Sequence, residues 1–198
     1  MKGELRLFVA VELGQEAREA LRQLVARAQS RQAAECIRWV DPDKMHITLR
    51  FLGQVEEGLV PGIASALHAA CAGRQPFELR LGGLGSFPSE AAPRVIWVGL
   101  APEGMAELES LQKAVNEALH KIMGTPEDRE FRPHITVGRV RDKVSQKERQ
   151  AIRSLLAAMA PVPRASFVVD AASLMRSTLL PTGPQYECLY QARFCPER

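Results

Sequence analysis

One tetrapeptide occurs twice in this chain of 198 residues, nearly unchanged. His46-Ile47-Thr48-Leu49 returns as His134-Ile135-Thr136-Val137. Its β-branched residues favour a strand. Side chains of a strand alternate between its two faces, so a His and a Thr two positions apart share a face. If the two strands face each other, they bring together two imidazoles and two hydroxyls, a set suited to acid–base chemistry on a phosphate.

The similarity extends beyond the tetrapeptide. His134 follows His46 by 88 residues, and the same offset lays Arg6-Leu7-Phe8-Val9-Ala10-Val11 on Arg94-Val95-Ile96-Trp97-Val98-Gly99. Each half of the chain therefore reads as a strand, a helix and then a strand that carries His-x-Thr. This repeat predicts a single bilobal domain over residues 1–198, with two pseudo-symmetric lobes that turn their His-x-Thr strands toward each other.

Hydrophobic periodicity predicts the remaining elements. Strands are expected over 5–13, 37–40, 45–52, 77–81, 94–100, 133–140, 167–174 and 186–194, and helices over 15–32, 57–72, 104–122 and 145–159. The glycine-rich stretch 82–85 is interpreted as a flexible connection, and residues 181–184 join the last two strands. This order favours an α+β fold with antiparallel sheet over a doubly wound parallel fold.

Charge and composition exclude several classes of protein. The net charge of +3 is too small for a polycation that coats nucleic acid, although it allows a local basic face. The apolar run 7–11 is too short for a signal-peptide core, and no run reaches the roughly 18 apolar residues of a membrane span. The four cysteines form no C-x-x-C pair and are predicted to be reduced thiols. We therefore expect a cytoplasmic protein with no membrane partner.

The repeated His and Thr suit phosphoryl chemistry without a metal. Near neutral pH one imidazole can be neutral and accept a proton from water, while the other is protonated and donates to a leaving oxygen. Threonine hydroxyls can donate to the non-bridging phosphoryl oxygens. A catalytic zinc usually needs three protein ligands. Because no carboxylate or Cys lies in register with the two His, we expect no metal and no cofactor.

Two longer stretches carry a resemblance to a known family. M-H-I-T-L-R-F-L-G and F-R-P-H-I-T-V-G-R-V resemble the signatures of the two-histidine phosphoesterase superfamily, and more narrowly of the RNA 2′,3′-cyclic phosphodiesterases, also called 2′-5′ RNA ligases. The supporting stretches are R-L-F-V-A-V, R-W-V-D-P-D-K, P-F-E-L-R-L-G-G-L-G-S-F-P and P-R-V-I-W-V-G. The resemblance covers almost the whole chain.

The resemblance implies a two-lobed α+β fold whose antiparallel sheets, with helices outside, line a central cleft. It implies opening of a 2′,3′-cyclic phosphate at an RNA 3′ end to a 2′-phosphomonoester, and possible reversible 2′-5′ ligation. On the family pattern His46 is the proton donor and His134 the proton acceptor, while Thr48 and Thr136 hold the phosphate. From the residues alone, the near-equivalent halves leave the acid and base roles open. The expected partners are RNA 3′ ends or small cyclic nucleotides, and the expected state is a monomer.

The family pattern also suggests substrate roles for Phe51 and Arg139, each five residues after its histidine. Phe51 could stack on a nucleobase or belong to the core, and Arg139 could stack or bind phosphate. An odd offset points both away from the His face of a regular strand, so a bulge or the end of the strand would have to turn them. Arg50 and Arg132 have the right parity to lie beside the phosphate, with a solvated surface position as the alternative.

Two other functions remain open at this stage. The same chemistry could act on a small cyclic phosphate, such as one on ADP-ribose, or on 2′-5′ oligonucleotides. A protein of a different class, a nucleotide- or RNA-binding module with weak or no turnover, would keep the site without using it. The intact His and Thr pairs count against that module, and a panel of substrates separates the three functions.

Overall fold

The protein has a mixed α+β fold, as the sequence predicts. The computed structural model describes residues 3–124, 130–181 and 183–195. The strands are β1 (Glu4–Glu12), β2 (Ile37–Trp39), β3 (His46–Glu56), β4 (Phe77–Phe87), β5 (Val95–Leu100), β6 (Ile135–Val140), β7 (Ser166–Val169), β8 (Ala171–Leu180) and β9 (Gly183–Arg193). The helices are α1 (Gln15–Gln29), α2 (Val60–Cys71), α3 (Met105–Met123) and α4 (Gln146–Met159), with 3-10 segments η1 (Gln32–Cys36), η2 (Pro42–Lys44) and η3 (Glu57–Leu59).

The strands form one curled sheet whose order is symmetric. The order is β7-β4-β5-β6-β3-β1-β8-β9, with β2 beside β6, and every strand pair is antiparallel. Reading outward from the middle, β6-β5-β4-β7 mirrors β3-β1-β8-β9. The two halves meet at a single residue pair, Ile47 opposite Ile135. The two strands that carry the repeated tetrapeptide therefore lie at the centre of the sheet.

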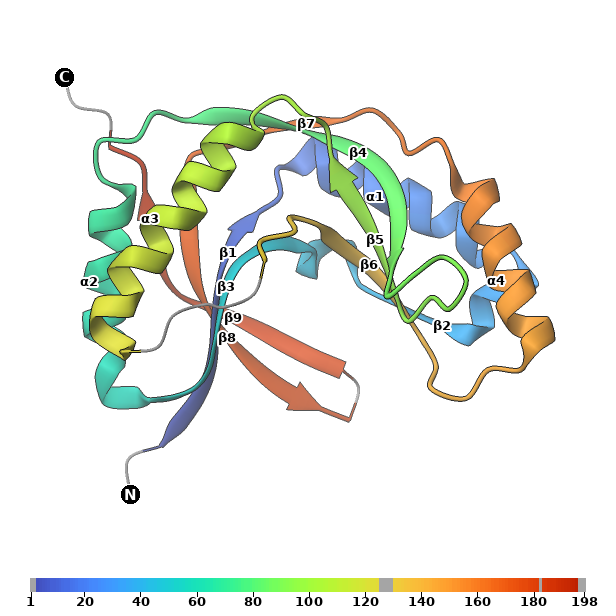
Figure 1. Ribbon diagram of the computed structural model, residues 1–198, viewed down its shortest axis with the longest axis horizontal. Coiled ribbons are helices and arrows are strands. Elements are labelled where there is room, and N and C mark those ends of the chain that lie inside the picture. The colour runs from blue at the N-terminus through green and yellow to red at the C-terminus, as the bar shows by residue number, and fades with distance from the viewer. Residues whose placement is uncertain (1–2, 125–129, 182, 196–198) are drawn as a thin grey trace.

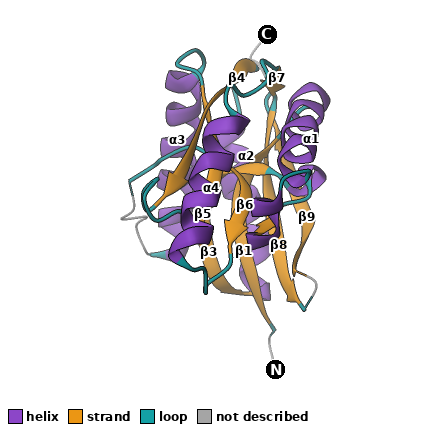
Figure 2. Ribbon diagram, turned by 90° about the vertical axis from the view of Figure 1, so that its right-hand side faces the viewer, coloured by secondary structure: helices purple, strands orange, loops and turns teal. Residues whose placement is uncertain are grey.

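The helices lie outside the strands in two groups. Helix α2 packs beside α3 on one flank, and α1 packs against α4 on the other (Figures 1 and 2). Helix α2 also contacts β8 and β9, α3 contacts β3, and α1 contacts β7. Among the described helices, none is both long and apolar enough to cross a membrane.

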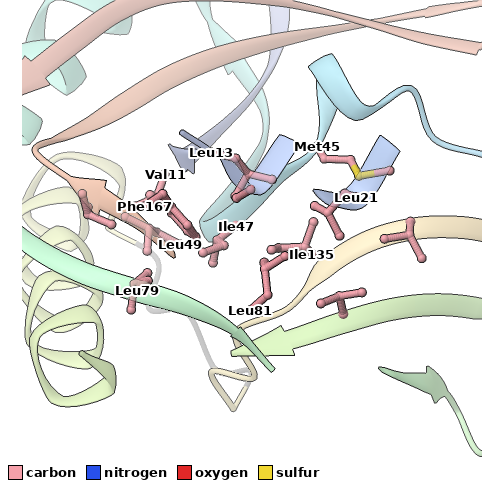
Figure 3. Close-up of a cluster of buried hydrophobic side chains, with 14 of the residues drawn as sticks. Val11, Leu13, Leu21, Met45, Ile47, Leu49, Leu79, Leu81, Ile135 and Phe167 are labelled. Carbon is pink, nitrogen blue, oxygen red and sulfur yellow. The ribbon is translucent and has the colours of Figure 1, made fainter. Parts of the chain in front are cut away.

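The hydrophobic core lies on one face of the two central strands. Ile47 and Ile135 are fully buried and pack with Val11, Leu21 and Phe167 (Figure 3). Because side chains alternate along a strand, His46 and Thr48 point to the opposite face. We call this opposite face the site face. Burial of the isoleucines on one side therefore fixes which way the His and Thr side chains point.

The glycine-rich stretch 82–85 is part of strand β4, so its prediction as a flexible connection is wrong. At Gly85 an added Cβ would lie 2.3 Å from the indole of Trp97. Glycine is therefore present because a ring of the neighbouring strand β5 lies against the backbone, and this close approach needs no flexibility. The predicted strand over 167–174 is also corrected, because β7 ends at Val169 and β8 begins at Ala171 to form a hairpin with β9.

Candidate active site

The register of the central strands brings the two tetrapeptides together on the site face. Ile47 pairs with Ile135 in an antiparallel arrangement. Residues on either side of such a pair also face each other, so His46 lies opposite Thr136 and Thr48 lies opposite His134. All four side chains are half-buried. The arrangement gives one anion two imidazoles and two hydroxyls from opposite sides.

Both histidines have the same hydrogen bond on one ring nitrogen. The distance from His46 Nδ1 to the carbonyl oxygen of Lys44 is 2.9 Å, and from His134 Nδ1 to the carbonyl oxygen of Arg132 it is 2.7 Å. A carbonyl oxygen only accepts, so each Nδ1 donates and carries the proton. The hydrogen bond therefore leaves Nε2 of each ring as the nitrogen that can exchange a proton with a substrate.

Aromatic rings hold each imidazole in place. His46 packs against Phe8 and, edge-on, Tyr186, with ring centroids 4.8 and 5.2 Å away. His134 packs edge-on against Phe87 at 5.1 Å and lies 6.4 Å from Trp97. These rings come from other strands, and the sequence alone did not point to them. The strand periodicity around Tyr186 is a signal in the sequence, whereas the glycine-rich stretch 82–85 predicts a flexible connection just before Phe87 and gives no sign of a strand there.

The surroundings of His46 favour its neutral form. Burial is the main cause that lowers the pKa of His46 below its ordinary 6.5. The hydrogen bond to the Lys44 carbonyl raises the pKa, the charge of His134 lowers it, and the carboxylate of Glu12 raises it.

Glu12 is held beside His46 by several contacts. The two residues are paired across β1 and β3. The hydroxyl of Ser173 donates to Glu12 Oε1 over 2.7 Å, the Gln191 amide lies 3.5 Å from the same oxygen, and Arg18 lies 4.0 Å from Oε2. In the second half Val98 pairs with Ile135, so the residue that corresponds to Glu12, next to His134, is the uncharged Gly99. The two halves therefore differ in charge even though they share the His and Thr.

Titration of His46 gives a direct test of this environment. We expect its pKa, followed by NMR of the imidazole, to lie below 6.5 in the free protein. Tyr186→Ala should raise that pKa because water reaches the ring, and Glu12→Gln should lower it because a favourable charge is lost. Tyr186→Phe keeps the ring contact and serves as the control. A lower pKa in Tyr186→Ala, or a higher one in Glu12→Gln, would contradict the assigned causes.

A pair of β-bulges turns Phe51 and Arg139 toward the site. In β3 the register against β1 slips between Thr48 and Arg50, and in β6 the register against β5 slips between Thr136 and Gly138. Each bulge inserts one residue and inverts the alternation that follows. Phe51, 56% exposed, lies 6.4 Å from the Phe8 ring that touches His46. Arg139 is exposed, and its charge reaches Tyr186. Both residues therefore return to the site face.

The same bulge removes Arg50 from the site, which corrects the prediction for that residue. The Arg50 side chain is only 3% exposed, and its guanidinium donates to the carbonyl oxygen of Asn116 in helix α3 over 2.9 Å. It therefore lies on the core side of the sheet. Arg132 is exposed and its guanidinium binds Glu130, while its backbone carbonyl accepts from His134. Within the described residues, no contact brings the Arg132 side chain to the pair of histidines, and its role beside phosphate stays a prediction.

The donor set at this face suits an anion better than a metal. Among the described residues, no group of three or more His, Cys, Asp and Glu is placed to hold a metal ion. The polar atoms available are two imidazole nitrogens and two hydroxyls, and Arg139 adds a positive charge. These groups donate hydrogen bonds to, and exchange protons with, a phosphate.

Known proteins share both sequence and fold with this chain. The model of the 2'-5' RNA ligase superfamily matches residues 16–179. The RNA 2',3'-cyclic phosphodiesterase of Methanothermobacter thermautotrophicus is 34% identical over 185 residues, which cover 92% of this chain and 95% of the relative. That of Thermotoga maritima is 31% identical, with 96% of each chain covered.

Solved structures show the same fold. TT0787 of Thermus thermophilus superposes with a TM-score of 0.73 at 30% identity, covering 98% of this chain and all of that one. LigT of E. coli, in complex with 3'-AMP, has a TM-score of 0.72 at 22% identity and covers 96% of this chain and 98% of its own. The family match spans most of the chain, including both repeated tetrapeptides, and this protein belongs to the 2'-5' RNA ligase superfamily.

Proposed function

We propose that this protein hydrolyses the 2′,3′-cyclic phosphate at the 3′ end of RNA to a 2′-phosphomonoester, without a metal ion. The observation that carries the proposal is the Ile47–Ile135 pair, which sets the two His-x-Thr motifs across from each other on one face. The relatives named RNA 2',3'-cyclic phosphodiesterase support the same reaction. We infer that residues 1–198 act as one bilobal unit, because each half supplies one histidine and one threonine.

The reaction follows from the two exchangeable Nε2 atoms. Water attacks phosphorus while His134 Nε2 accepts one of its protons. The bond between phosphorus and O3′ breaks, and His46 Nε2 donates a proton to O3′. The hydroxyls of Thr48 and Thr136 donate to the non-bridging oxygens, where negative charge grows in the transition state. The product carries a free 3′-hydroxyl and a 2′-phosphate.

The family pattern assigns the donor role to His46, and the carboxylate of Glu12 is the neighbouring charge that favours this role. A donor must be protonated, and burial alone works against that form of His46. The carboxylate of Glu12 acts in the opposite direction, and the anionic substrate would add to its effect. No acid stands at Gly99, the equivalent position of the other half. We therefore propose His46 as donor and His134 as acceptor.

The substrate side of the site fits a nucleotide end. The exposed ring of Phe51 offers a surface on which a nucleobase can stack. Arg139 offers a guanidinium for phosphate. If the 5′-hydroxyl of a second RNA replaces water, the same groups would form or break a 2′-5′ linkage, so reversible ligation is a second activity of the same site.

Product analysis tests the proposed function. An RNA with a 2′,3′-cyclic phosphate end should give only the 2′-phosphate, at an unchanged rate in the presence of a chelator. A 3′-phosphate product would contradict the assignment of O3′ as the leaving oxygen, and loss of activity with chelator would contradict metal independence. Turnover of an ADP-ribose cyclic phosphate or of 2′-5′ oligonucleotides, but not of RNA, would favour the small-substrate alternative. Binding without turnover would favour a nucleotide-binding module.

Two further properties stay predictions. A cytoplasmic location is supported by the four cysteines, all of which are free thiols, as in proteins of reducing compartments. The monomeric state rests on the completeness of the site, since one chain supplies both His-x-Thr motifs. The mass of the protein in solution tests the second of these.

A further inference from the structure

A row of polar side chains crosses four strands of the first half of the sheet. Arg6 in β1 pairs with Gln54 in β3, and Tyr186 in β9 pairs with Ser177 in β8. The antiparallel register of β1 and β8 places Ser177 beside Arg6. Directly opposite residues of neighbouring strands share a face. We call Gln54, Arg6, Ser177 and Tyr186 the polar row.

The neighbours of Arg6 in β1 fix the direction of its side chain. Leu7 is buried in the core, whereas Phe8 packs against His46 on the site face. Side chains alternate along a strand, so Arg6 points to the same side as Phe8. Its positive charge acts on Tyr186, whose ring also packs against His46. The polar row therefore belongs to the face that carries the histidines.

The polar row offers hydrogen-bond donors that the protein itself does not use. Arg6 and Gln54 are exposed, and Ser177 and Tyr186 are half-buried. Within the described residues, none of these four side chains forms a hydrogen bond or an ion pair. A guanidinium, an amide and two hydroxyls can all donate to one anionic group. Burial raises the pKa of Tyr186, so its phenol keeps the proton that it donates.

The surroundings of the polar row limit it to one anion. On its inner side lie the rings of Phe8 and Phe51, 6.4 Å apart. On its outer side Glu4 pairs with Glu56, so the next row carries two carboxylates. Neither carboxylate forms an ion pair with Arg6 in the described part of the chain. A phosphate beside Arg6 is attracted, and a second one farther out is repelled.

The spacing along β1 suits the substrate. The Phe8 ring lies 4.8 Å from the ring of His46, and Arg6 precedes Phe8 by two residues, roughly 7 Å along the strand. With the cyclic phosphate between the histidines and the nucleobase on Phe51, the terminal nucleotide covers the aromatic rings. The phosphate on its 5′ side then reaches the polar row. Guanidiniums bind phosphate oxygens through two parallel N–H donors.

We propose that the polar row, with Arg6 as its charged member, binds the phosphodiester on the 5′ side of the terminal nucleotide. This inference rests on the proposed function, because it extends the same site along the site face. Arg139 stands in the other half of the sheet and keeps its role at the cyclic phosphate.

The test compares two substrates that differ by one group. One is a nucleoside 2′,3′-cyclic phosphate with a free 5′-hydroxyl, and the other carries a 5′-methylphosphate, which reproduces the phosphodiester without a second base. Arg6→Ala should lower kcat/KM for the methylphosphate by roughly tenfold, mainly through KM, and for the 5′-hydroxyl substrate by no more than about twofold. Arg6→Lys should restore part of the loss. Gln54→Ala should show a smaller loss with the same selectivity, because a neutral donor is removed.

Arg176→Ala is the matched control. Arg176 pairs with Leu7, so it lies on the opposite face of the sheet, and it forms an ion pair with Glu187. The variant removes the same charge from the strand beside Arg6 and should change kcat/KM by less than about twofold on either substrate. An equal loss in Arg176→Ala would show a general electrostatic attraction and overturn the role of the polar row.

The remaining outcomes separate this inference from the proposed function. Equal losses on both substrates in Arg6→Ala, no loss on either, or a loss that follows the base instead of the 5′ phosphate would overturn the role of Arg6. A wild-type enzyme inactive on both substrates would contradict the proposed function itself. In that case the Kd values of the two corresponding 2′-phosphate nucleotides decide, because only a contact with the 5′ phosphate predicts that Arg6→Ala weakens binding of the methylphosphate alone.

Discussion

Replacing either His46 or His134 with alanine is expected to lower kcat for a 2′,3′-cyclic phosphate by roughly 10²–10⁴-fold, the range typical of a lost general acid or base. Both imidazoles present Nε2 to the site, and water in the place of a lost ring is a much poorer acid and base near neutral pH. The loss should appear in kcat more than in KM, because proton transfer occurs in the transition state. Steady-state rates with a 2′,3′-cyclic mononucleotide measure this loss of kcat without contributions from the binding of the rest of an RNA.

The other two histidines of the chain are matched controls. His68 in α2 and His120 in α3 are exposed on helices, and His68 lies 3.3 Å from the Tyr190 hydroxyl. His68→Ala and His120→Ala should leave kcat within about twofold. The double variant of His46 and His134 should be little worse than either single one, since the pair acts as a unit. Full activity in either single variant, at an unchanged melting temperature, would refute two-histidine catalysis.

The central part of this site is predictable from the sequence because it depends on two periodicities. Strand alternation places His46 and Thr48 on one face, and the 88-residue repeat gives a reason for the second motif to meet the first. The buried pair of Ile47 and Ile135 follows from the same alternation. These features are local or repeated, so they can be predicted without knowledge of how the strands pair.

The bulges are not predictable in this way. Arg50 has the right parity for the site and Phe51 the wrong one, yet the structure reverses both because the register against β1 slips. A bulge depends on how a strand pairs with its neighbour. The tetrapeptide contains no glycine or proline that would predict one. The second bulge, in β6, stands at the corresponding residues of the repeat. The repeat therefore predicts that the bulges match, although it does not predict that they exist.

Contacts between strands that are far apart in the chain are also not predictable from the sequence. Gly85 looks like part of a linker because it belongs to a stretch, 82–85, in which only Leu84 is not glycine. Its actual neighbour is the ring of Trp97. Tyr186 and Glu12 reach His46 only through the hairpin of β8 and β9 and through strand β1. Such residues are found when the sheet order is known.

The symmetry of the site makes the division of labour between the histidines a question for experiment. A substrate with sulfur in place of the bridging O3′ separates the roles. A thiol has a pKa near 8.5, far below that of an alcohol, so a thiolate leaves without a proton donor. On this substrate His46→Ala should regain most of its lost activity, whereas His134→Ala should remain impaired by roughly 10²-fold or more because water still needs a base.

The Glu12→Gln variant tests the assignment of His46 as the proton donor on the same two substrates. If Glu12 stabilises the protonated His46, this variant should lose activity on the oxygen substrate as pH rises, and lose little on the sulfur substrate, for which the donor is dispensable. Rescue of His134→Ala instead of His46→Ala would exchange the two roles, and rescue of neither would show that proton donation to O3′ is not the function of either ring. A carboxylate on one side only is thus the feature that breaks the symmetry, and the sulfur substrate measures whether catalysis uses it.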